Sequence, residues 1–524
     1  MLRGRNRARR AVGSGAVLAL AGVAQAFSMA WPWDSVAPLW ERGEPVWWLQ
    51  LAALALALAV LEGSTSARQA ALRGAGFATV WLAASWGWLF ISMHTYGGLP
   101  APLSALAVLA LGAGLGLYYA LALGVFFALA RVHIALKAPL FVACWTMAEL
   151  ARARWFTGFG WSAIGYSHVQ GPLAPLLPWV GVYGVGAVAA GLAALLALAG
   201  PWPQRIARCC VVALALLALP WLPRPHGHSA GSLSVALLQG NIAQEEKFLP
   251  HRGVADALLW YGHQLRQRQA QLVVTPETAL PLLPQQLPQG YWDGLHAVFA
   301  HGERAALVGI PLGDADQGYT NSVLGLVPGQ AQDWRYDKHH LVPFGEFIPP
   351  LFRWFTELMA IPLGDFNRGA QVQPPLNWQG QRIGVGICYE NLFGTTLAAA
   401  LRDPANGPTL WVNVSNLGWF GAHLAMDQHL VISRARALEL DRPLVLATNT
   451  GHTAVVDHLG RVVAALPPHQ RGVLEATVEG RSGLTPYAAW ASVWGHGPLW
   501  WLALGVLALA WRRARVPESL KSAP

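Results

Sequence analysis

Three residues in the second half of this 524-residue sequence have side chains that together could carry out covalent catalysis. Glu277, Lys338 and Cys388 each lie at or near the end of a run in which a β-strand is expected to stop. A cysteine supplies a nucleophile, a glutamate supplies a base for its proton, and a lysine supplies a cation for a developing oxyanion. Each of these residue types alone is more often structural or solvated, so the hypothesis depends on the sequence around them.

Cys388 lies between a predicted strand over 382–387 and a predicted helix over about 392–402. At such an elbow, nearby backbone N–H groups can stabilise a thiolate and a developing oxyanion. Cys388 also has no partner for a disulfide in its own region of the chain. The remaining cysteines lie in long apolar segments, where a thiol usually serves as a small packing residue: Cys144, Cys209 and Cys210.

Two adjacent histidines, His339 and His340, follow Lys338 and could be proposed as metal ligands. Neighbouring residues on a strand point to opposite faces, so both imidazoles cannot reach one ion from a strand. The sequence also offers no companion cysteine or histidine at the spacing of a zinc site. We therefore expect neither a metal nor another cofactor.

Short β-rich runs alternate with helical stretches between Gly231 and about Gly480. This order predicts an α/β sandwich in which functional side chains follow the ends of strands. The expected strands cover 233–239, 271–274, 305–310, 322–327, 382–387, 409–414 and 444–448. The expected helices cover 252–270, 392–402 and 424–441.

Long apolar segments flank this α/β region on both sides. Hydrophobic residues make up 54% of the chain and charged residues 12%, and the mean hydropathy is +0.36. A bilayer span needs ~20 mostly apolar residues. The sequence therefore predicts seven spans before the α/β region and one after it, at 12–30, 46–62, 74–93, 102–130, 138–152, 172–199, 206–222 and 494–511.

The positions of arginine and lysine predict how these spans are oriented. The basic groups fall on one side of the membrane if seven spans precede the α/β region, with Arg152 and Arg154 as exceptions. Because cytoplasmic loops are enriched in Lys and Arg, both termini are expected in the cytoplasm and 231–480 outside it. These loop charges account for much of the net charge of +9, so no nucleic-acid partner is expected. The groups lie at 3–10, 68–73, 131–137, 205–208 and 512–515.

With these residues in view, the chain resembles a known family. Glu277, Lys338 and Cys388, in this order, look like the triad of the nitrilase superfamily, and a more specific resemblance is to the apolipoprotein N-acyltransferases of the bacterial inner membrane. The strings that carry it extend over nearly the whole chain: Phe156-Thr157-Gly158-Phe159, Leu238-Gln239-Gly240-Asn241-Ile242, Pro276-Glu277, 338–347, Ile387-Cys388-Tyr389-Glu390, Thr448-Asn449-Thr450-Gly451 and Gly483-Leu484-Thr485-Pro486-Tyr487. Two positions depart from the usual pattern: Phe248 stands where many members have Trp, and Leu417 where many have Asp.

The resemblance implies a fold, an activity and a location. It implies a nitrilase-like αββα sandwich inserted between seven transmembrane helices and one, with domains over 1–228, 229–480 and 481–524. It implies transfer of a fatty acyl chain from a phospholipid donor to a diacylglyceryl apolipoprotein, the last step of lipoprotein maturation, by a monomer without a cofactor. The protein would lie in the bacterial inner membrane with its catalytic domain in the periplasm.

The resemblance also implies roles for individual residues. Cys388 would carry the acyl group as a thioester, Glu277 would move the protons, and Lys338 would stabilise the oxyanion together with the Tyr389 backbone N–H. Lys338 is also expected to favour the thiolate of Cys388. Further residues are expected to support the triad or to bind substrate: Asn321, Glu346, Tyr389, Glu390, Phe248, Trp419 and Phe420. The apolar run 351–363 is a candidate lid.

Two other functions remain open on this sequence. A membrane-tethered amidase or nitrilase would use the same triad but would not need seven preceding spans. A transporter or receptor with an inactive external domain would need charged pathways within the spans, where Glu149 is nearly the only acid. Formation of a lipid thioester would distinguish the acyltransferase from both.

Overall fold

The structure is a computed structural model that describes residues 2–34, 41–130, 134–330, 332–349, 366–422 and 424–515. The chain forms two compact units. Unit 1 contains Met1–Phe90, Pro100–Arg224 and Trp494–Pro524, and unit 2 contains Ile91–Leu99 and Pro225–Val493. The candidate lid over 351–363 lies outside the described residues.

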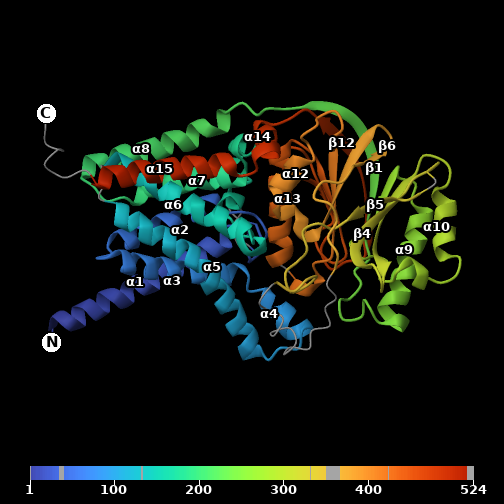
Figure 1. The fold of residues 1–524 in the computed structure, drawn as a ribbon, viewed down its shortest axis with the longest axis horizontal. Coiled ribbons are helices and arrows are strands. Elements are labelled where there is room, and N and C mark those ends of the chain that lie inside the picture. Colours follow the sequence, from blue (N-terminus) through green and yellow to red (C-terminus); the bar gives the residue numbers. More distant parts are fainter. Residues whose placement is uncertain are drawn as a thin grey trace. The chain divides into compact units, whose positions relative to one another are not determined.

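Unit 1 is a bundle of apolar helices (Figure 1). Small residues allow its helices to approach closely: a Cβ atom at Gly112 would lie 3.1 Å from the backbone nitrogen of Ala83 in the neighbouring helix. Large aromatic side chains, among them Trp81 and Trp145, stack between the helices. The helices are α1 (Leu2–Phe27), α2 (Trp47–Glu62), α3 (Ala67–Ser85), α5 (Ala101–Leu129), α6 (Ile134–Arg154), α7 (Leu177–Ala197), α8 (Trp202–Ala218) and α15 (Gly497–Arg515), with a short α4 (Leu89–Ile91) after α3.

Several of these helices are long and apolar enough to cross a membrane. Within the described residues, three helices meet this condition, Ala101–Leu129, Ala174–Ala197 and Trp202–Trp221, and two bent pairs raise the number to five if each pair is one span. The predicted third span, 74–93, is wrong in its bounds, because α3 ends at Ser85 and Leu89–Tyr96 turns by 65°. The count of seven spans and one stays a prediction.

Arg152, a buried arginine near the end of α6, holds the turn that follows this helix. Arg152 is fully buried and donates to the hydroxyl of Tyr119 at 3.0 Å and to the carbonyls of Phe159 and Trp161 at 2.6 and 2.7 Å. Glu149 accepts the backbone N–H of Ile164 at 3.0 Å. Arg152 is therefore a structural charge inside the bundle and not a loop charge, which explains why it departs from the alternation of basic groups.

Unit 2 contains two six-stranded sheets. In the first sheet the order is β12-β1-β2-β3-β4-β5, and in the second it is β11-β10-β9-β8-β7-β6. The first sheet contains β1 (His228–Gln239), β2 (Leu272–Val274), β3 (Ala305–Asp314), β4 (Gly318–Leu326), β5 (Trp334–Asp337) and β12 (Gly472–Ser482). The second contains β6 (Leu376–Trp378), β7 (Gln381–Ile387), β8 (Leu410–Ser415), β9 (Leu444–Thr448), β10 (Ala454–Val456) and β11 (Val462–Ala465).

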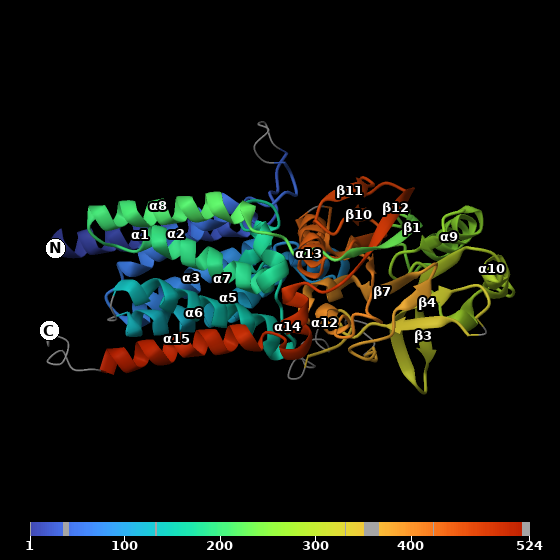
Figure 2. The same ribbon diagram turned by 90° about the horizontal axis from the view of Figure 1, so that it is seen from above.

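The sheets face each other, and helices cover their outer faces (Figure 2). One apolar core, with Leu237 and Val412 among its members, lies between the sheets. A second core joins the first sheet to α9 (Ala255–Gln267) and α10 (Tyr291–Phe299). A third joins the other sheet to α12 (Gly394–Ala399), α13 (Leu424–Leu440) and α14 (Pro486–Trp494). The predicted α/β sandwich is confirmed, and its order of layers is helix, sheet, sheet, helix.

The strands that precede Glu277, Lys338 and Cys388 run in directions that place their carboxyl ends at one edge of each sheet. β1, β2 and β3 are mutually parallel, and β5 runs in the same direction because β4 lies antiparallel to both β3 and β5. β7, β8 and β9 are also mutually parallel. Glu277 and Lys338 therefore follow carboxyl ends at one edge of the first sheet, and Cys388 follows the carboxyl end of β7 in the second. Ligands commonly bind at such edges.

Candidate active site

The backbone at Cys388 makes a sharp turn directly after β7. Its φ angle is +51°, in the left-handed region, and a 3-10 turn over Cys388–Leu392 follows. The carbonyl of Cys388 accepts a hydrogen bond from Asn413 Nδ2 at 3.3 Å and lies 3.2 Å from His429 Nε2. A residue other than glycine in this conformation costs ~1–3 kcal/mol and needs surrounding structure to hold it. The elbow that the sequence predicted is thus a strained turn held by hydrogen bonds.

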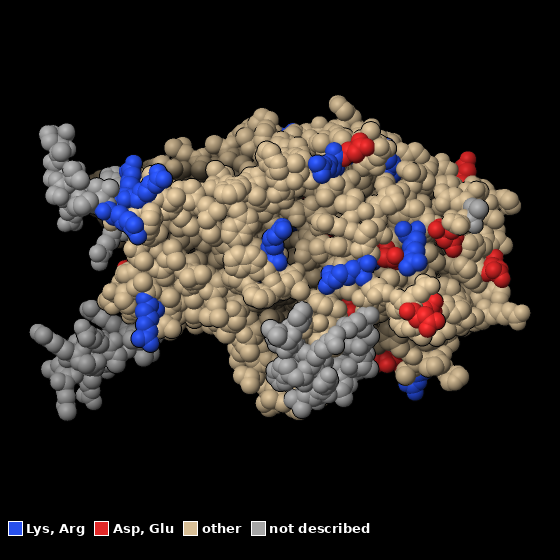
Figure 3. Space-filling model, viewed as in Figure 1, with Lys and Arg blue, Asp and Glu red and all other residues tan. Residues whose placement is uncertain are grey.

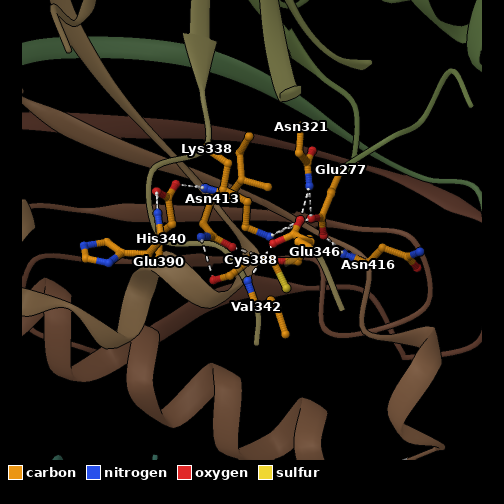
Figure 4. Close-up of polar contacts among 12 residues, drawn as sticks. Glu277, Asn321, Lys338, His340, Val342, Glu346, Cys388, Glu390, Asn413 and Asn416 are labelled. Carbon is orange, nitrogen blue, oxygen red and sulfur yellow. Dashed lines mark hydrogen bonds and ion pairs between the residues drawn. The ribbon is translucent and has the colours of Figure 1, made fainter. Parts of the chain in front are cut away.

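Lys338 connects two carboxylates next to this turn (Figure 4). Its ammonium lies 3.1 Å from Glu277 Oε1 and 2.9 Å from Glu346 Oε1. Asn321 Nδ2 donates to the same two oxygens at 2.7 Å each. All of these side chains are buried, with Lys338 only 1% exposed. The structure therefore brings together the three residues of the predicted triad and two of the residues expected to support them.

Further hydrogen bonds fix the orientation of Glu277 and Glu346. The second oxygen of Glu277 accepts the backbone N–H of Asn416 at 2.9 Å, and the second oxygen of Glu346 accepts that of Val342 at 2.8 Å. The backbone carbonyl of Glu277 accepts a hydrogen bond from the buried ammonium of Lys247 at 3.1 Å. Both carboxylates are held in one orientation, which a base that must reach a thiol and a substrate requires.

The charges of these groups follow from burial and from their neighbours. Burial opposes ionisation of Glu277, but Lys338, the hydrogen bond from Asn321 and Lys247 outweigh it and hold the pKa of Glu277 below its usual value. Burial lowers the pKa of Lys338, yet Glu277 and Glu346 raise it above its usual value. At neutral pH the resting site therefore holds Glu277 as a carboxylate and Lys338 as an ammonium ion.

Opposing influences act on the thiol of Cys388. Burial and the charge of Glu277 raise its pKa above the usual value, whereas Lys338 lowers it. Lys338 therefore favours the thiolate, as predicted, but desolvation and the nearby carboxylates outweigh this one ammonium. The sulfur is protonated at rest, so a nucleophilic role would require a base to take its proton.

Glu390 connects the turn of Cys388 to the loop that follows Lys338. Its Oε1 accepts the backbone N–H groups of His339 and His340 at 2.8 and 3.1 Å. Its Oε2 accepts the N–H of Ile387 and the hydroxyl of Tyr336, both at 2.8 Å. Burial raises the pKa of Glu390, and the four donors favour its ionised form. One carboxylate thus fixes the spacing between the nucleophile turn and the lysine.

The aromatic residues that are expected to contact substrate differ in how exposed their side chains are. Phe248 and Trp419 are 54% and 38% exposed, and Phe420 is partly buried against the core between the sheets. Trp419 contacts the ring of Tyr96, with ring centroids 5.6 Å apart. Tyr389 is buried against Phe393. Their part in binding substrate stays a prediction.

The histidines considered as metal ligands have other partners. His339 Nδ1 lies 2.8 Å from the carbonyl of Gly369, and His340 Nε2 lies 2.9 Å from Thr396 Oγ1. In the described part of the chain, one group of side chains has spacing that could suit a metal: His226, Asp441 and His458. The carboxylate of Asp441 lies 3.9 Å from Arg481 and accepts the N–H of Gly227. A neighbouring guanidinium disfavours a cation at that position.

Sequence reasoning missed several residues that shape the site. Asn413 and His429 hold the Cys388 carbonyl, and Asn416 orients Glu277. Lys247 was overlooked because it follows Glu245 and Glu246, a pattern typical of a solvated loop. Its position next to Phe248, a residue that the resemblance did single out, was the available signal.

The fold and the site define the class of protein. Residues 234–487 match the carbon-nitrogen hydrolase family, and residues 42–195 match the apolipoprotein N-acyltransferase N-terminal domain. A solved carbon-nitrogen hydrolase from Helicobacter pylori G27 is similar at 14% identity, over 55% of this chain and 96% of that chain, with a TM-score of 0.35. The family match over residues 234–487 gives unit 2 the nitrilase-like carbon-nitrogen hydrolase fold.

Relatives along the whole chain identify the family. The apolipoprotein N-acyltransferase of Verminephrobacter eiseniae is 54% identical, over 91% of this chain and 92% of that protein. The one of Ralstonia nicotianae is 44% identical, over 90% and 89%. The chain therefore belongs to the apolipoprotein N-acyltransferase family.

Proposed function

We propose that this protein transfers a fatty acyl chain from a membrane phospholipid to the α-amine of the diacylglyceryl-cysteine at the N-terminus of apolipoproteins, in two steps through a thioester on Cys388. The observation that carries the proposal is the strained turn at Cys388, which lies beside a buried lysine held between Glu277 and Glu346. Family membership supports the acyl transfer to lipoproteins. The donor and the covalent step are the proposed additions.

In the first step, the sulfur of Cys388 attacks the ester carbonyl of the phospholipid while Glu277 accepts its proton. A C–S bond forms, the ester C–O bond breaks, and Glu277 returns the proton to the departing alcohol oxygen. The Lys338 ammonium donates one hydrogen bond to Glu277 and one to Glu346, so its third N–H can donate to the oxyanion. The Tyr389 backbone N–H would be the second donor to the oxyanion. Such a donor contributes about 3–4 kcal/mol.

In the second step, the α-amine of the lipoprotein attacks the thioester. Glu277 accepts a proton from the amine and gives it to the departing sulfur, so an N–C bond forms and the C–S bond breaks.

The first step depends on a base. The pKa of the Cys388 thiol is raised, so its proton must be removed as the sulfur attacks the ester, and the fixed carboxylate of Glu277 is the base in position to remove it.

We also propose that unit 1 lies in the bacterial inner membrane with seven spans before residue 229 and one after residue 480, and that 229–480 is periplasmic. The ends of α2 and α7 and the start of α6 meet at Glu62, which accepts the N–H of Ala199 and lies 4.0 Å from Lys137. Arg73 near the start of α3 also bonds to the carbonyl of Val60 in α2. Figure 3 shows Lys and Arg gathered at the end of unit 1 where α15 finishes, beside a broad uncharged surface. This grouping supports the proposal that this end of unit 1 faces the cytoplasm.

We also expect the protein to act as a monomer.

The test is to isolate the intermediate. The purified full-length protein, incubated with a phospholipid that carries a labelled acyl chain and without lipoprotein, should retain one acyl group on the peptide that contains Cys388. Neutral hydroxylamine should release it, because thioesters are cleaved under conditions in which amides are stable. Cys388→Ala, Glu277→Gln and Lys338→Ala should not be labelled, whereas a triple variant of Cys144, Cys209 and Cys210 should be. Labelling that persists in Cys388→Ala would contradict the mechanism.

A further inference from the structure

A second buried ammonium, that of Lys247, lies beside the proposed base. The residue is 3% exposed, and its Nζ donates to the backbone carbonyl of Glu277 at 3.1 Å. Among the described residues this carbonyl is the one hydrogen-bond acceptor of the ammonium, which can donate three hydrogen bonds. Burial of a charge with so few partners is costly. A surface loop lysine would avoid that cost by pointing into water, so the inward position needs a reason.

The segment that carries Lys247 is firmly attached to unit 2. Ile242 exchanges two hydrogen bonds with the side chain of Asn449, at 3.0 and 2.8 Å. Gln244 accepts a hydrogen bond from Asn416 Nδ2 at 2.8 Å, and the N–H of the same Asn416 orients Glu277. The loop is therefore fixed to the residues that hold the base, and the position of Lys247 is part of the fold of the site.

The neighbours of Lys247 in the sequence are much more accessible to solvent. The Glu246 side chain is 42% exposed and lies 3.2 Å from the exposed Arg252, and Phe248 is 54% exposed, with its ring centroid 5.9 Å from the Lys247 ammonium. Lys247 is thus the charge of this loop that enters the site. Arg252 offers a matched comparison, because it is a cation of the same segment with no part in the buried network.

Lys247 offsets part of the negative charge of the buried cluster. Three carboxyl groups, those of Glu277, Glu346 and Glu390, lie near the ammonium of Lys338. Negative charge that develops on the sulfur or on the substrate oxygen would add to that of the carboxylates, and like charges in a buried site repel strongly. Lys247 gives the cluster a second cation, which faces both Glu277 and Cys388.

Given the proposed function, we propose that Lys247 is a positioning residue of the acyl transfer: held on the carbonyl of Glu277, it supplies a second positive charge that offsets the negative charge that develops while Cys388 attacks. Its substitution would leave the charge on the sulfur and on the substrate oxygen with one ammonium fewer to offset it, without removing any group that reacts. The effect would therefore appear in the rate of thioester formation and in its dependence on pH.

The titration of the site supports this assignment. Burial lowers the pKa of Lys247 to about 8, although Glu277 and Cys388, which face it from the ends of β2 and β7, act to raise it. The pKa of Glu277 is lowered, whereas those of Lys338 and Cys388 are raised, so these groups keep their charge state around pH 8. As the pH rises through about 8, Lys247 is the member of this cluster that loses its charge. The rate of thioester formation should fall with it.

The experiment measures thioester formation by the purified full-length protein between pH 6 and 9.5, with a diacyl phospholipid that carries a radiolabelled acyl chain. Lys247→Met should be slower by ~10- to 100-fold at pH 7, less than the ~100- to 1,000-fold cost of losing a donor aimed at the oxyanion. It should also lack the fall near pH 8. Lys247→Arg should keep its charge and move that fall to higher pH, because a guanidinium does not deprotonate in this range. Arg252→Met should behave as the parent does.

Two outcomes overturn the inference. One is a Lys247→Met protein with the parent rate and the parent pH profile. The other applies if Lys247→Met does not fold: the parent and Lys247→Arg would then be compared alone, and identical profiles for these two would exclude Lys247 as the titrating group. The two failures are distinguishable. A parent protein that forms no thioester at all would refute the proposed function and this inference with it, whereas a parent that forms the thioester and is unaffected by changes at Lys247 would refute this inference alone.

Discussion

Replacement of Glu390 by glutamine would test whether one carboxylate sets the distance between the nucleophile turn and Lys338. The carboxylate accepts four hydrogen bonds, two on each oxygen. A glutamine side chain has the same shape but presents an NH₂ group on one side, and that group cannot accept. If the NH₂ group faces His339 and His340, both of their N–H groups lose their acceptor; if it faces Ile387 and Tyr336, only the Ile387 N–H does, because the Tyr336 hydroxyl can turn to accept.

The size of the effect follows from this count. Each buried donor left unsatisfied costs about 1–3 kcal/mol, so Glu390→Gln with its amide in the less costly orientation should destabilise unit 2 by roughly 1–3 kcal/mol. For a unit of this size the thermal midpoint should fall by roughly 2–12 °C. Because the turn of Cys388 would move relative to Lys338, thioester formation should slow by about 100-fold.

The assay is thermal unfolding of the detergent-solubilised protein, followed by intrinsic fluorescence, together with the rate of acyl labelling at a temperature where the variant is folded. Glu475→Gln makes the same chemical change at an exposed position of β12 that is paired with Arg268, and it should shift stability by less than about 0.5 kcal/mol. A Glu390→Gln protein with the midpoint and rate of this control would refute the reasoning.

Two further predictions concern unit 1. Arg152→Met should destabilise the bundle by about 3–5 kcal/mol, because three buried acceptors lose their donor and Glu149 loses a neighbouring cation; thermal unfolding in detergent would show this, with the exposed Arg154→Met as control and equal midpoints as the contrary result. A reporter that is active only in the periplasm should work when fused at Gly231 and fail when fused after Arg515; activity at both positions would overturn the predicted number of spans.

Much of the fold of unit 2 could be predicted from the sequence, because its central strands are continuous apolar runs. β7, β8 and β9 lie within one residue of their predicted bounds, and their parallel pairing explains why both of their faces are apolar. Strands β6 and β10 contain three residues each, and β11 contains four and is largely exposed, so each is too short to show a clear periodic pattern. Tertiary pairing, rather than local preference, forms these strands.

The candidate site was predictable in part for a similar reason. Residues that end apolar strands, such as Cys388, are visible because the strand before them is visible. Lys247 and Asn416 reach the site from loops, and their partners lie 30 and 139 residues away in the chain. Pattern within a short window carries no information about such contacts. The influence of Lys338 on Cys388 was predictable, but the net rise of the thiol pKa was not, because a sequence does not show the depth of burial.

The pKa of Glu277 is lowered and that of Cys388 is raised, and these opposite shifts also explain how a free thiol would persist in the periplasm, where we propose that unit 2 lies. A thiol is oxidised and forms mixed disulfides mainly as its thiolate. Burial and the carboxylates raise the pKa of Cys388 above its usual value, and the cations near Glu277 lower that of the base. At rest, therefore, proton transfer from sulfur to Glu277 is unfavourable, and the reactive form is scarce. In the proposed mechanism, an ester bound with its carbonyl oxygen at Lys338 would change this balance, because the negative charge that leaves the sulfur would move to an oxyanion beside an ammonium. The thiol would then become nucleophilic with the substrate in place, and at rest it would be protected from oxidation.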